Sequence, residues 1–218
     1  LEFRRVLFRS SAVTGSGLLD VQGGTLSIDP AAEVQASLRI SSGTVTVQGN
    51  LADIQSLTLG GTGALRTGAG DITAKTFTFA AGTLGGAGHT TVTGTSSLSA
   101  NALAIDTGHT LTLKGDATWA KGQSVTLTNK GTLVNESGAI FTDLGSNFGT
   151  QSYSRQLGSG GGSFINRGTY VHDGIGITNL YVFDNQGVID VRQGVVNVLK
   201  GNTVGGAVKL ASGAALTF

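Results

Sequence analysis

The chain has 218 residues, and 36 of them are glycine, whereas there is one proline, no cysteine and no methionine. This glycine content is more than twice the usual share of about 7%, and the 12% of charged residues is about half the usual share. The lack of cysteine excludes disulfide frameworks, thiolate metal sites and cysteine nucleophiles. No apolar stretch approaches the ~18 residues of a membrane-spanning helix. The composition favours an all-β chain of many short strands.

The first ten residues resemble the translation of a common sequencing adapter, and no apolar h-region follows that would make them a signal peptide. Residues 1–10 are therefore predicted to be an adapter-derived artefact. Without their three arginines and one glutamate, residues 11–218 carry 11 basic and 12 acidic side chains, a net charge of −1. No basic patch remains, which argues against binding to nucleic acid or anionic membranes. We predict that residues 11–218 form one continuous solenoid segment, truncated at both ends, of a longer protein.

Short runs of strand character follow glycine–threonine pairs along the first half of the chain. Residues 24–28 and 43–47 show this pattern 19 residues apart, and further glycines follow at Gly61 and Gly82. Beyond residue 94 the glycine spacing drifts, although alternating apolar residues still predict strands. The repeats are expected to begin near residue 17.

The second half repeats more strictly. Five glycines there lie 18, 19, 19 and 19 residues apart: Gly131, Gly149, Gly168, Gly187 and Gly206. The first four carry asparagine two positions earlier, and because Asn and Gly tolerate a left-handed backbone, each motif predicts a tight corner. Regular corners between short strands are typical of a β-solenoid. Because left-handed β-helices repeat in hexapeptides, the period predicts a right-handed parallel β-helix of about 19 residues per coil, with roughly eleven coils along ~50 Å.

Residues at equal distance from these glycines should stack on one another. The corners then predict a ladder of asparagines: Asn129, Asn147, Asn166 and Asn185. Two positions after each glycine, a mainly apolar column should face the interior: Leu133, Gln151, Tyr170, Ile189 and Val208. On adjacent coils, Asp190 should form an exposed ion pair with Lys209, and Asp173 one with Arg192.

A polysaccharide-active enzyme on this fold would need carboxylates clustered on adjacent coils of one face, often with calcium. The acidic residues here are scattered. Glu136 and Asp173 share an offset but lie two coils apart, with Ser154 between them. Other carboxylates fall at different offsets: Asp143, Asp184 and Asp190. We therefore predict no catalytic residue and no enzymatic activity.

Metal and cofactor sites are also not expected. The three histidines show no metal-ligand spacing, and two of them, His89 and His109, follow a glycine at a turn, where exposure is expected. No nucleophile elbow, phosphate loop or dinucleotide fingerprint is present. Paired threonines such as Thr76/Thr78 could bind ice if they kept one register over many coils, but the irregular spacing between pairs argues against a common register. The sequence therefore predicts no cofactor-binding and no metal-ligating residue.

Three stretches resemble the repeats of large bacterial exported β-helix proteins: residues 164–170, 183–191 and 207–218. These proteins include autotransporter passengers, filamentous-haemagglutinin-like adhesins and β-strand-repeat surface proteins, and the resemblance covers most of residues 17–218. It implies a glycine-rich fragment of a secreted or cell-surface protein, from a Gram-negative bacterium, that acts as a stiff stalk or an adhesive surface.

Partners implied by this resemblance are host or environmental glycans or proteins, and the remainder of the longer chain. Residues 145–163, where the repeat pattern breaks most, are the first candidate for binding. Two alternatives remain open: a polysaccharide lyase or hydrolase, and an ice-binding solenoid.

Overall fold

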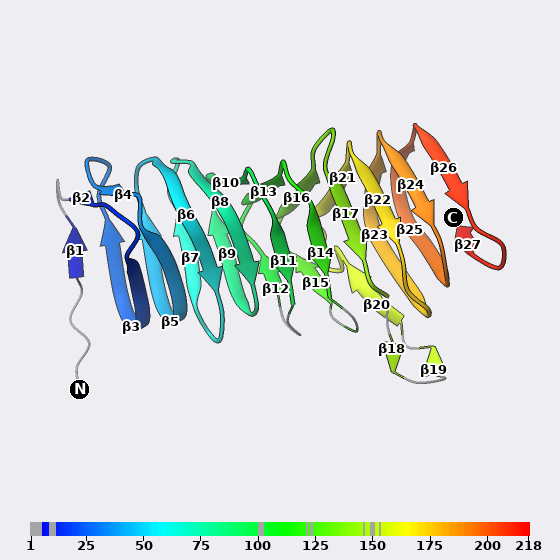
Figure 1. Ribbon diagram of the computed structural model, residues 1–218, viewed down its shortest axis with the longest axis horizontal. Helices are drawn as coiled ribbons and strands as arrows, with labels where there is room; N and C mark the ends of the chain where they lie inside the picture. The colour runs from blue at the N-terminus through cyan, green and yellow to red at the C-terminus, as the bar shows by residue number, and fades with distance from the viewer. Residues whose placement is uncertain are drawn as a thin grey trace.

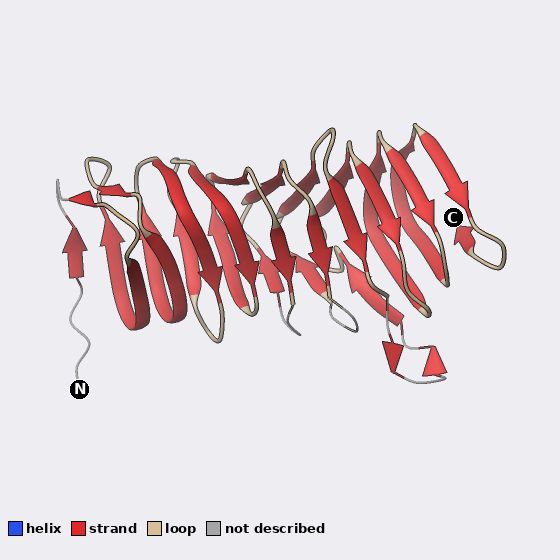
Figure 2. Ribbon diagram, viewed as in Figure 1, coloured by secondary structure: helices blue, strands red, loops and turns tan. Residues whose placement is uncertain are grey.

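The structure is a computed structural model that describes residues 6–8, 12–99, 103–120, 122, 124–145, 147–148, 151–152 and 154–218. These residues contain strands and loops but no helix, and the parallel strands stack in about nine coils of roughly 20 residues (Figures 1 and 2). The predicted β-solenoid is therefore confirmed. Nine coils at ~4.8 Å per stacked strand rise about 40 Å, which is less than the length predicted from eleven shorter coils.

The strands pair in three continuous parallel ladders. Ladder 1 contains β3 (Leu18–Ile28), β5 (Ser37–Val47), β6 (Leu51–Leu59), β8 (Ile72–Phe79), β11 (Ser96–Leu98), β14 (Ala117–Trp119), β17 (Ile140–Asp143), β22 (Thr169–His172), β24 (Val188–Val191) and β26 (Ala207–Leu210).

Ladder 2 continues from the ends of β3 and β5 through β7 (Ala64–Thr67), β9 (Gly82–Gly86), β12 (Leu103–Ile105), β15 (Val125–Leu127), β20 (Ser154–Leu157), β23 (Ile177–Asn185), β25 (Val195–Val204) and β27 (Ala215–Thr217). At its amino-terminal edge, β1 (Val6–Phe8) pairs with β3.

Ladder 3 runs from the starts of β6 and β8 through β10 (His89–Val92), β13 (Thr110–Leu113), β16 (Thr132–Asn135) and β21 (Ser163–Asn166) to the ends of β23 and β25. Four short strands lie outside these ladders: β2 (Ala12–Val13) pairs with β4 (Glu33–Val34), and β18 (Asn147–Phe148) pairs with β19 (Gln151–Ser152).

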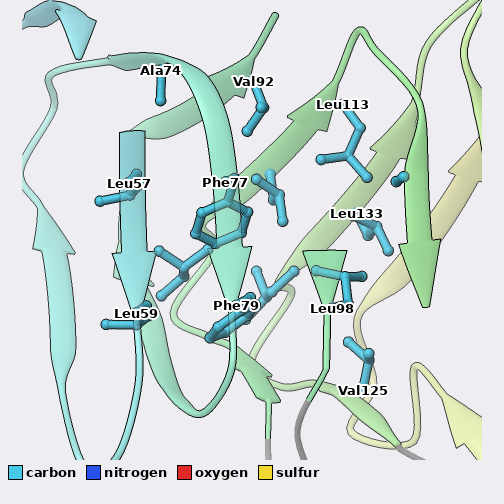
Figure 3. Packing of buried hydrophobic residues seen from close by; sticks show 14 of the residues in the cluster. Leu57, Leu59, Ala74, Phe77, Phe79, Val92, Leu98, Leu113, Val125 and Leu133 are labelled. Carbon is cyan, nitrogen blue, oxygen red and sulfur yellow. The ribbon is translucent and has the colours of Figure 1, made fainter. Parts of the chain in front are cut away.

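Apolar side chains from the three ladders fill the interior of the coil stack. Alternation within each strand turns every second residue inward, as in β8, where Phe77 and Phe79 are buried and Thr78 is not. Figure 3 shows these two rings packed beside Leu57, Leu59 and Leu98 of the adjoining coils. The buried side chains form one cluster along the stack, so each coil is held by its neighbours above and below.

Glycine at the corners permits close contact between successive coils. A Cβ atom added at Gly187 would lie 2.0 Å from the carbonyl oxygen of Gly168 in the coil below. Gly187 and Gly206 are related in the same way. The predicted register of the corner glycines is therefore correct from Gly168 to Gly206. Position 187 needs glycine because the close approach of the two coils leaves no room for a side chain.

We expect Gly187→Ala to lower the free energy of unfolding by about 1–3 kcal/mol, because the new methyl group would meet backbone that cannot move aside without breaking the ladder. Gly60→Ala is the matched control, since nothing lies within 4 Å of a Cβ atom placed there. Urea unfolding followed by far-UV circular dichroism measures both variants. An equal loss of free energy of unfolding in both variants would show that the close contact with Gly168 does not restrict which residue can occupy position 187.

The glycine frame is wrong before Gly168. Gly131 lies in register with Gly162, because Thr132 pairs with Ser163, and Gly149 lies outside the described residues. The asparagine ladder is therefore built from Asn135, Asn166 and Asn185 (Asn129 and Asn147 are not part of it). Each amide donates to the next oxygen, over 2.8 Å from Asn135 to Asn166 and 2.7 Å from Asn166 to Asn185. All three side chains are buried.

The predicted interior column changes for the same reason. Tyr170, Ile189 and Val208 stack as expected, but Leu133 belongs to a neighbouring column with Phe164 and Phe183, and Gln151 lies in β19. The prediction placed residues of these two columns in a single column because one coil is longer than the others. Asn135 and Asn166 are 31 residues apart, 12 more than the 19 between Asn166 and Asn185.

One of the two predicted ion pairs is present. Arg192 lies 3.5 Å from the carboxylate of Asp173, as expected, and 3.1 Å from that of Asp190. Lys209 is the strand neighbour of Asp190, but the carboxylate of Asp190 is paired within its own coil, to Arg192. These groups are at least partly exposed, so the pairs contribute at most about 1 kcal/mol each.

The last coil exposes the interior columns. Val208 and Leu210 continue the columns of Ile189 and Val191, yet they are 44% and 52% exposed. An uncovered strand edge with apolar side chains favours association. We expect this 218-residue chain to self-associate with increasing concentration, and the double variant Val208→Lys/Leu210→Lys to do so less. Static light scattering tests this prediction, and a monomer at every concentration would contradict it.

Candidate binding site: a long coil above a buried charge cluster

The solenoid is interrupted between β17 and β20, within the stretch that the sequence singles out for binding. After Asp143 the chain leaves the coil, forms the antiparallel β18–β19 pair and returns at Ser154. Figure 1 shows this hairpin projecting from the body of the stack near β20. Because a coil in a solenoid needs only to return to its register, added residues at one corner project outward without disturbing the coils above and below.

A cluster of polar side chains is buried where the hairpin leaves the solenoid. Asp143 and Arg155, which flank the excursion, form an ion pair, and their side chains are 0% and 2% exposed. Tyr170 donates its hydroxyl hydrogen to Asp143 over 2.6 Å, and the Nδ1 atom of His172 lies 2.9 Å from the same carboxylate oxygen. The backbone N–H of Gly145 donates to the other oxygen over 2.7 Å. The carboxylate is thus fully coordinated by hydrogen-bond donors.

The guanidinium of Arg155 also contacts the coils on both sides. It donates to the carbonyl oxygen of Ala120 over 2.6 Å and to the hydroxyl of Thr178 over 3.3 Å. Its carbon atom lies 3.6 Å from the ring centroid of Trp119, a favourable cation–π geometry. Aromatic rings continue this packing along the interior from Trp119 to Phe141, with centroids 6.3 Å apart.

Burial determines the protonation of the cluster. Desolvation lowers the pKa of Arg155 to about 9, so the guanidinium remains charged at neutral pH and balances Asp143. Desolvation raises the pKa of Tyr170, which therefore stays a hydrogen-bond donor. Desolvation, and then the charge of Arg155, lower the pKa of His172 to about 4. His172 is thus neutral and donates its Nδ1 hydrogen to Asp143.

This cluster holds the two ends of the hairpin at the solenoid, and its side chains are closed to solvent. No substrate can reach Asp143 or His172 in this arrangement, so the cluster does not have the open geometry that general acid–base catalysis requires. The arrangement is suited to presenting a projecting segment on a fixed base.

A second buried histidine corrects the sequence-based prediction. His109 was expected at the surface, but it is 0% exposed, and its ring lies between the hydroxyls of Thr67 and Thr90 at 3.1 and 3.0 Å. Desolvation and the nearby charge of His89 lower the pKa of His109 to about 4. His89 is exposed, as predicted. The hydroxyl of Thr67 additionally accepts the backbone hydrogen of Gly88, so this cluster braces adjoining coils.

Two of the scattered carboxylates of the sequence analysis come together in the fold, because Asp173 and Asp190 both pair with Arg192. Glu136 pairs separately with Arg167 over 2.7 Å. Asp143 is buried with Arg155. Among the described residues, no group of three or more histidine, aspartate or glutamate side chains could hold a metal ion.

The threonine pairs do not share a register, as predicted. Thr44 belongs to ladder 2, Thr78 to ladder 1 and Thr91 to ladder 3. Thr91 pairs with Thr112 on the next coil. The pair Thr91/Thr93 is therefore shifted by two residues relative to the pair Thr110/Thr112. A flat array built from these pairs is therefore absent from the part of the chain that the structure describes.

The buried polar residues follow a pattern that is visible in the sequence. Asp143 lies two positions after Phe141, Arg155 two before Leu157, and His172 two after Tyr170, so strand alternation turns each toward the interior. The prediction missed them because isolated charged residues are usually exposed.

Comparisons with known proteins give no relative for this chain: no protein-family model, no curated protein and no solved structure matches it. None of the described segments is a helix of the length and apolarity that a membrane crossing needs.

Proposed function

We propose that this chain is a structural and adhesive segment of a large bacterial surface protein, exported from a Gram-negative cell. The observation that carries the proposal is a stack of about nine coils in which, among the described residues, a single coil extends a hairpin beside a buried ion pair. A stack held by a continuous core and three ladders is suited to a stiff stalk. A projecting hairpin on a fixed base is suited to contact with another molecule.

The partners that this function requires are glycans or proteins outside the cell, together with the remainder of the longer chain. Support comes from the repeat resemblance and from the chemistry of the surface. The exposed or half-buried carboxylates of Asp20, Glu136 and Asp173 are each paired with an arginine, which favours a structural role for these groups over a catalytic one. We accordingly propose that the segment binds or supports and does not catalyse.

The deciding experiment measures binding and turnover on the same purified chain. Intact protein and a variant in which residues 146–153 are replaced by a short glycine turn are applied to a glycan array and to cells. Binding that requires the hairpin, without degradation of acidic or neutral polysaccharides, supports the proposal. Polysaccharide degradation that is lost in Asp173→Asn or Asp190→Asn would instead establish the lyase or hydrolase alternative.

A further inference from the structure

A second departure from solenoid regularity lies near the amino-terminal end, far along the chain from the hairpin. There β4 pairs with β2 and with no other described strand, while β6 contains a register shift between Leu51 and Ile54. Within this shift Asp53 has a φ angle of 63°, which turns the chain outward in the middle of the strand. The two neighbouring coils therefore have no strand pairing between β4 and β6 at this position.

A groove of about 380 Å³ lies here, lined by residues 30–35 and 50–53. A second depression of about 290 Å³ adjoins it, and Gln35 lines both. The main groove is within the range of small-ligand sites, about 300–1,000 Å³, and has room for one or two sugar rings. Because the two depressions share Gln35, a chain-like ligand in one could extend into the other.

The polar lining of the groove is acidic and contains no basic residue. Glu33 and Asp53 are exposed, and no described cation lies within ion-pair distance of either carboxylate. This distinguishes them from Asp20, Glu136 and Asp173, which are each paired with arginine. A ligand that enters the groove thus meets unneutralised negative charge, so a cationic group is favoured and an anionic one is disfavoured.

Amide side chains provide the rest of the recognition chemistry. Gln35, Asn50 and Gln55 line the two depressions, and each amide offers both donors and acceptors, as a row of sugar hydroxyls requires. Two of them are oriented by the fold: Asn50 accepts the backbone hydrogen of Asp71 over 2.9 Å, and Gln55 accepts from Lys75 over 2.9 Å. Fixed amides lose less conformational entropy when a ligand binds.

We propose that this groove binds an amino sugar within an oligosaccharide, with its protonated amine at Glu33 and Asp53 and its hydroxyls at the amides. The inference rests on the proposed adhesive function, to which it adds a ligand class and a second contact surface. A metal ion fits less well, since no third described carboxylate or histidine completes a site. An ammonium group needs only hydrogen-bond acceptors and negative charge, which the two carboxylates provide.

The test is isothermal titration of the purified 218-residue chain with glucosamine oligomers of two to four units. Fully acetylated oligomers of the same lengths are the matched ligands. At about pH 6 the free amines are mostly protonated, because ordinary amine pKa values are higher. We expect the glucosamine oligomers to bind at least about tenfold more tightly than the acetylated ones, because the latter lack the charge-assisted hydrogen bonds. Added salt should reduce this difference.

The variants Asp53→Asn and Glu33→Gln should each weaken glucosamine binding about tenfold or more. Asparagine tolerates the left-handed backbone, so Asp53→Asn removes the charge without disturbing the strand. Glu136→Gln, outside the groove, is the control and should bind like the unchanged protein. Equal affinity for both oligomer types would overturn the assignment to amino sugars, and calcium binding that depends on Glu33 and Asp53, without sugar binding, would overturn it in favour of a cation site.

The two proposals can fail separately. If no oligomer binds, the groove assignment is overturned, while hairpin-dependent attachment to the glycan array or to cells still supports the adhesive function. If attachment does not need the hairpin and polysaccharides are degraded, the proposed function is overturned, whether or not the groove binds glucosamine.

Discussion

Replacing Asp143 by alanine should reduce the free energy of unfolding by about 3–5 kcal/mol, because Arg155 would remain buried without its counter-charge. Tyr170 and His172 would also lose their shared acceptor. The matched control is Asp20→Ala, which breaks the exposed pair with Arg39 and should reduce the free energy of unfolding far less, because water screens exposed ion pairs.

Urea unfolding measures both variants, and the single tryptophan is a convenient reporter. Trp119 lies against Arg155, so its fluorescence reports on the cluster directly, while far-UV circular dichroism reports on the whole stack. The double variant Asp143→Leu/Arg155→Leu should recover part of the loss, since it leaves no unpaired charge. A loss below about 1 kcal/mol in Asp143→Ala would show that the ion pair is not needed to hold the coil.

Acid should destabilise the fold through its buried histidines. The folded-state pKa of His109 is about 4 and the ordinary value is 6.5, so below pH 6.5 the unfolded chain binds a proton that the folded chain does not. The stability from keeping His109 neutral is complete above pH 6.5 and is lost as the pH falls toward 4. The loss is about 3 kcal/mol at 1.36 kcal/mol per pKa unit. His172 changes in the same direction.

Unfolding curves between about pH 7 and pH 4 test this prediction. His109→Gln keeps a polar side chain between Thr67 and Thr90 but cannot titrate in this range, so it should reduce the dependence of stability on pH. Exposed His89→Gln is the control and should leave most of that dependence unchanged. If His109→Gln and the original chain lose the same free energy on acidification, His109 is not the group responsible.

The regular glycines were sufficient to predict the architecture, because close contact between coils allows little else at those positions. From Gly168 to Gly206 the register was correct to the residue, and so was the exposed pair of Asp173 with Arg192. Here the spacing of the glycines equals the length of a coil. Residues at the same distance from successive glycines are therefore paired on neighbouring coils.

The register could not be predicted across the hairpin. The glycines at Gly131 and Gly168 are 37 residues apart, close to two ordinary coils, but only one coil of 31 residues separates Asn135 from Asn166. The longer coil has 12 more residues than its neighbour, and Gly131 lies four residues before Asn135 whereas Gly168 lies two after Asn166. Together these differences give a spacing that looks like one further repeat. The groove near Asp53 was missed for a different reason, since a register shift in one strand leaves no periodic signal.

Arg155 has a mechanical consequence for a protein pulled along its axis. Most neighbouring strands share three or more paired residues, but among the described residues β20 pairs with β15 through Leu157 and Val125 alone, followed by an isolated bridge between Thr128 and Gly160. At this narrow point the side chain of Arg155 contacts Ala120 on one side and Thr178 on the other. One buried guanidinium therefore adds a connection between coils where ladder 2 has the fewest paired residues, although ladders 1 and 3 remain fully paired there. Under tension, coils peeled away from either end would reach a barrier at this tether, and the hairpin beside it would be among the last parts of the stack to lose its support.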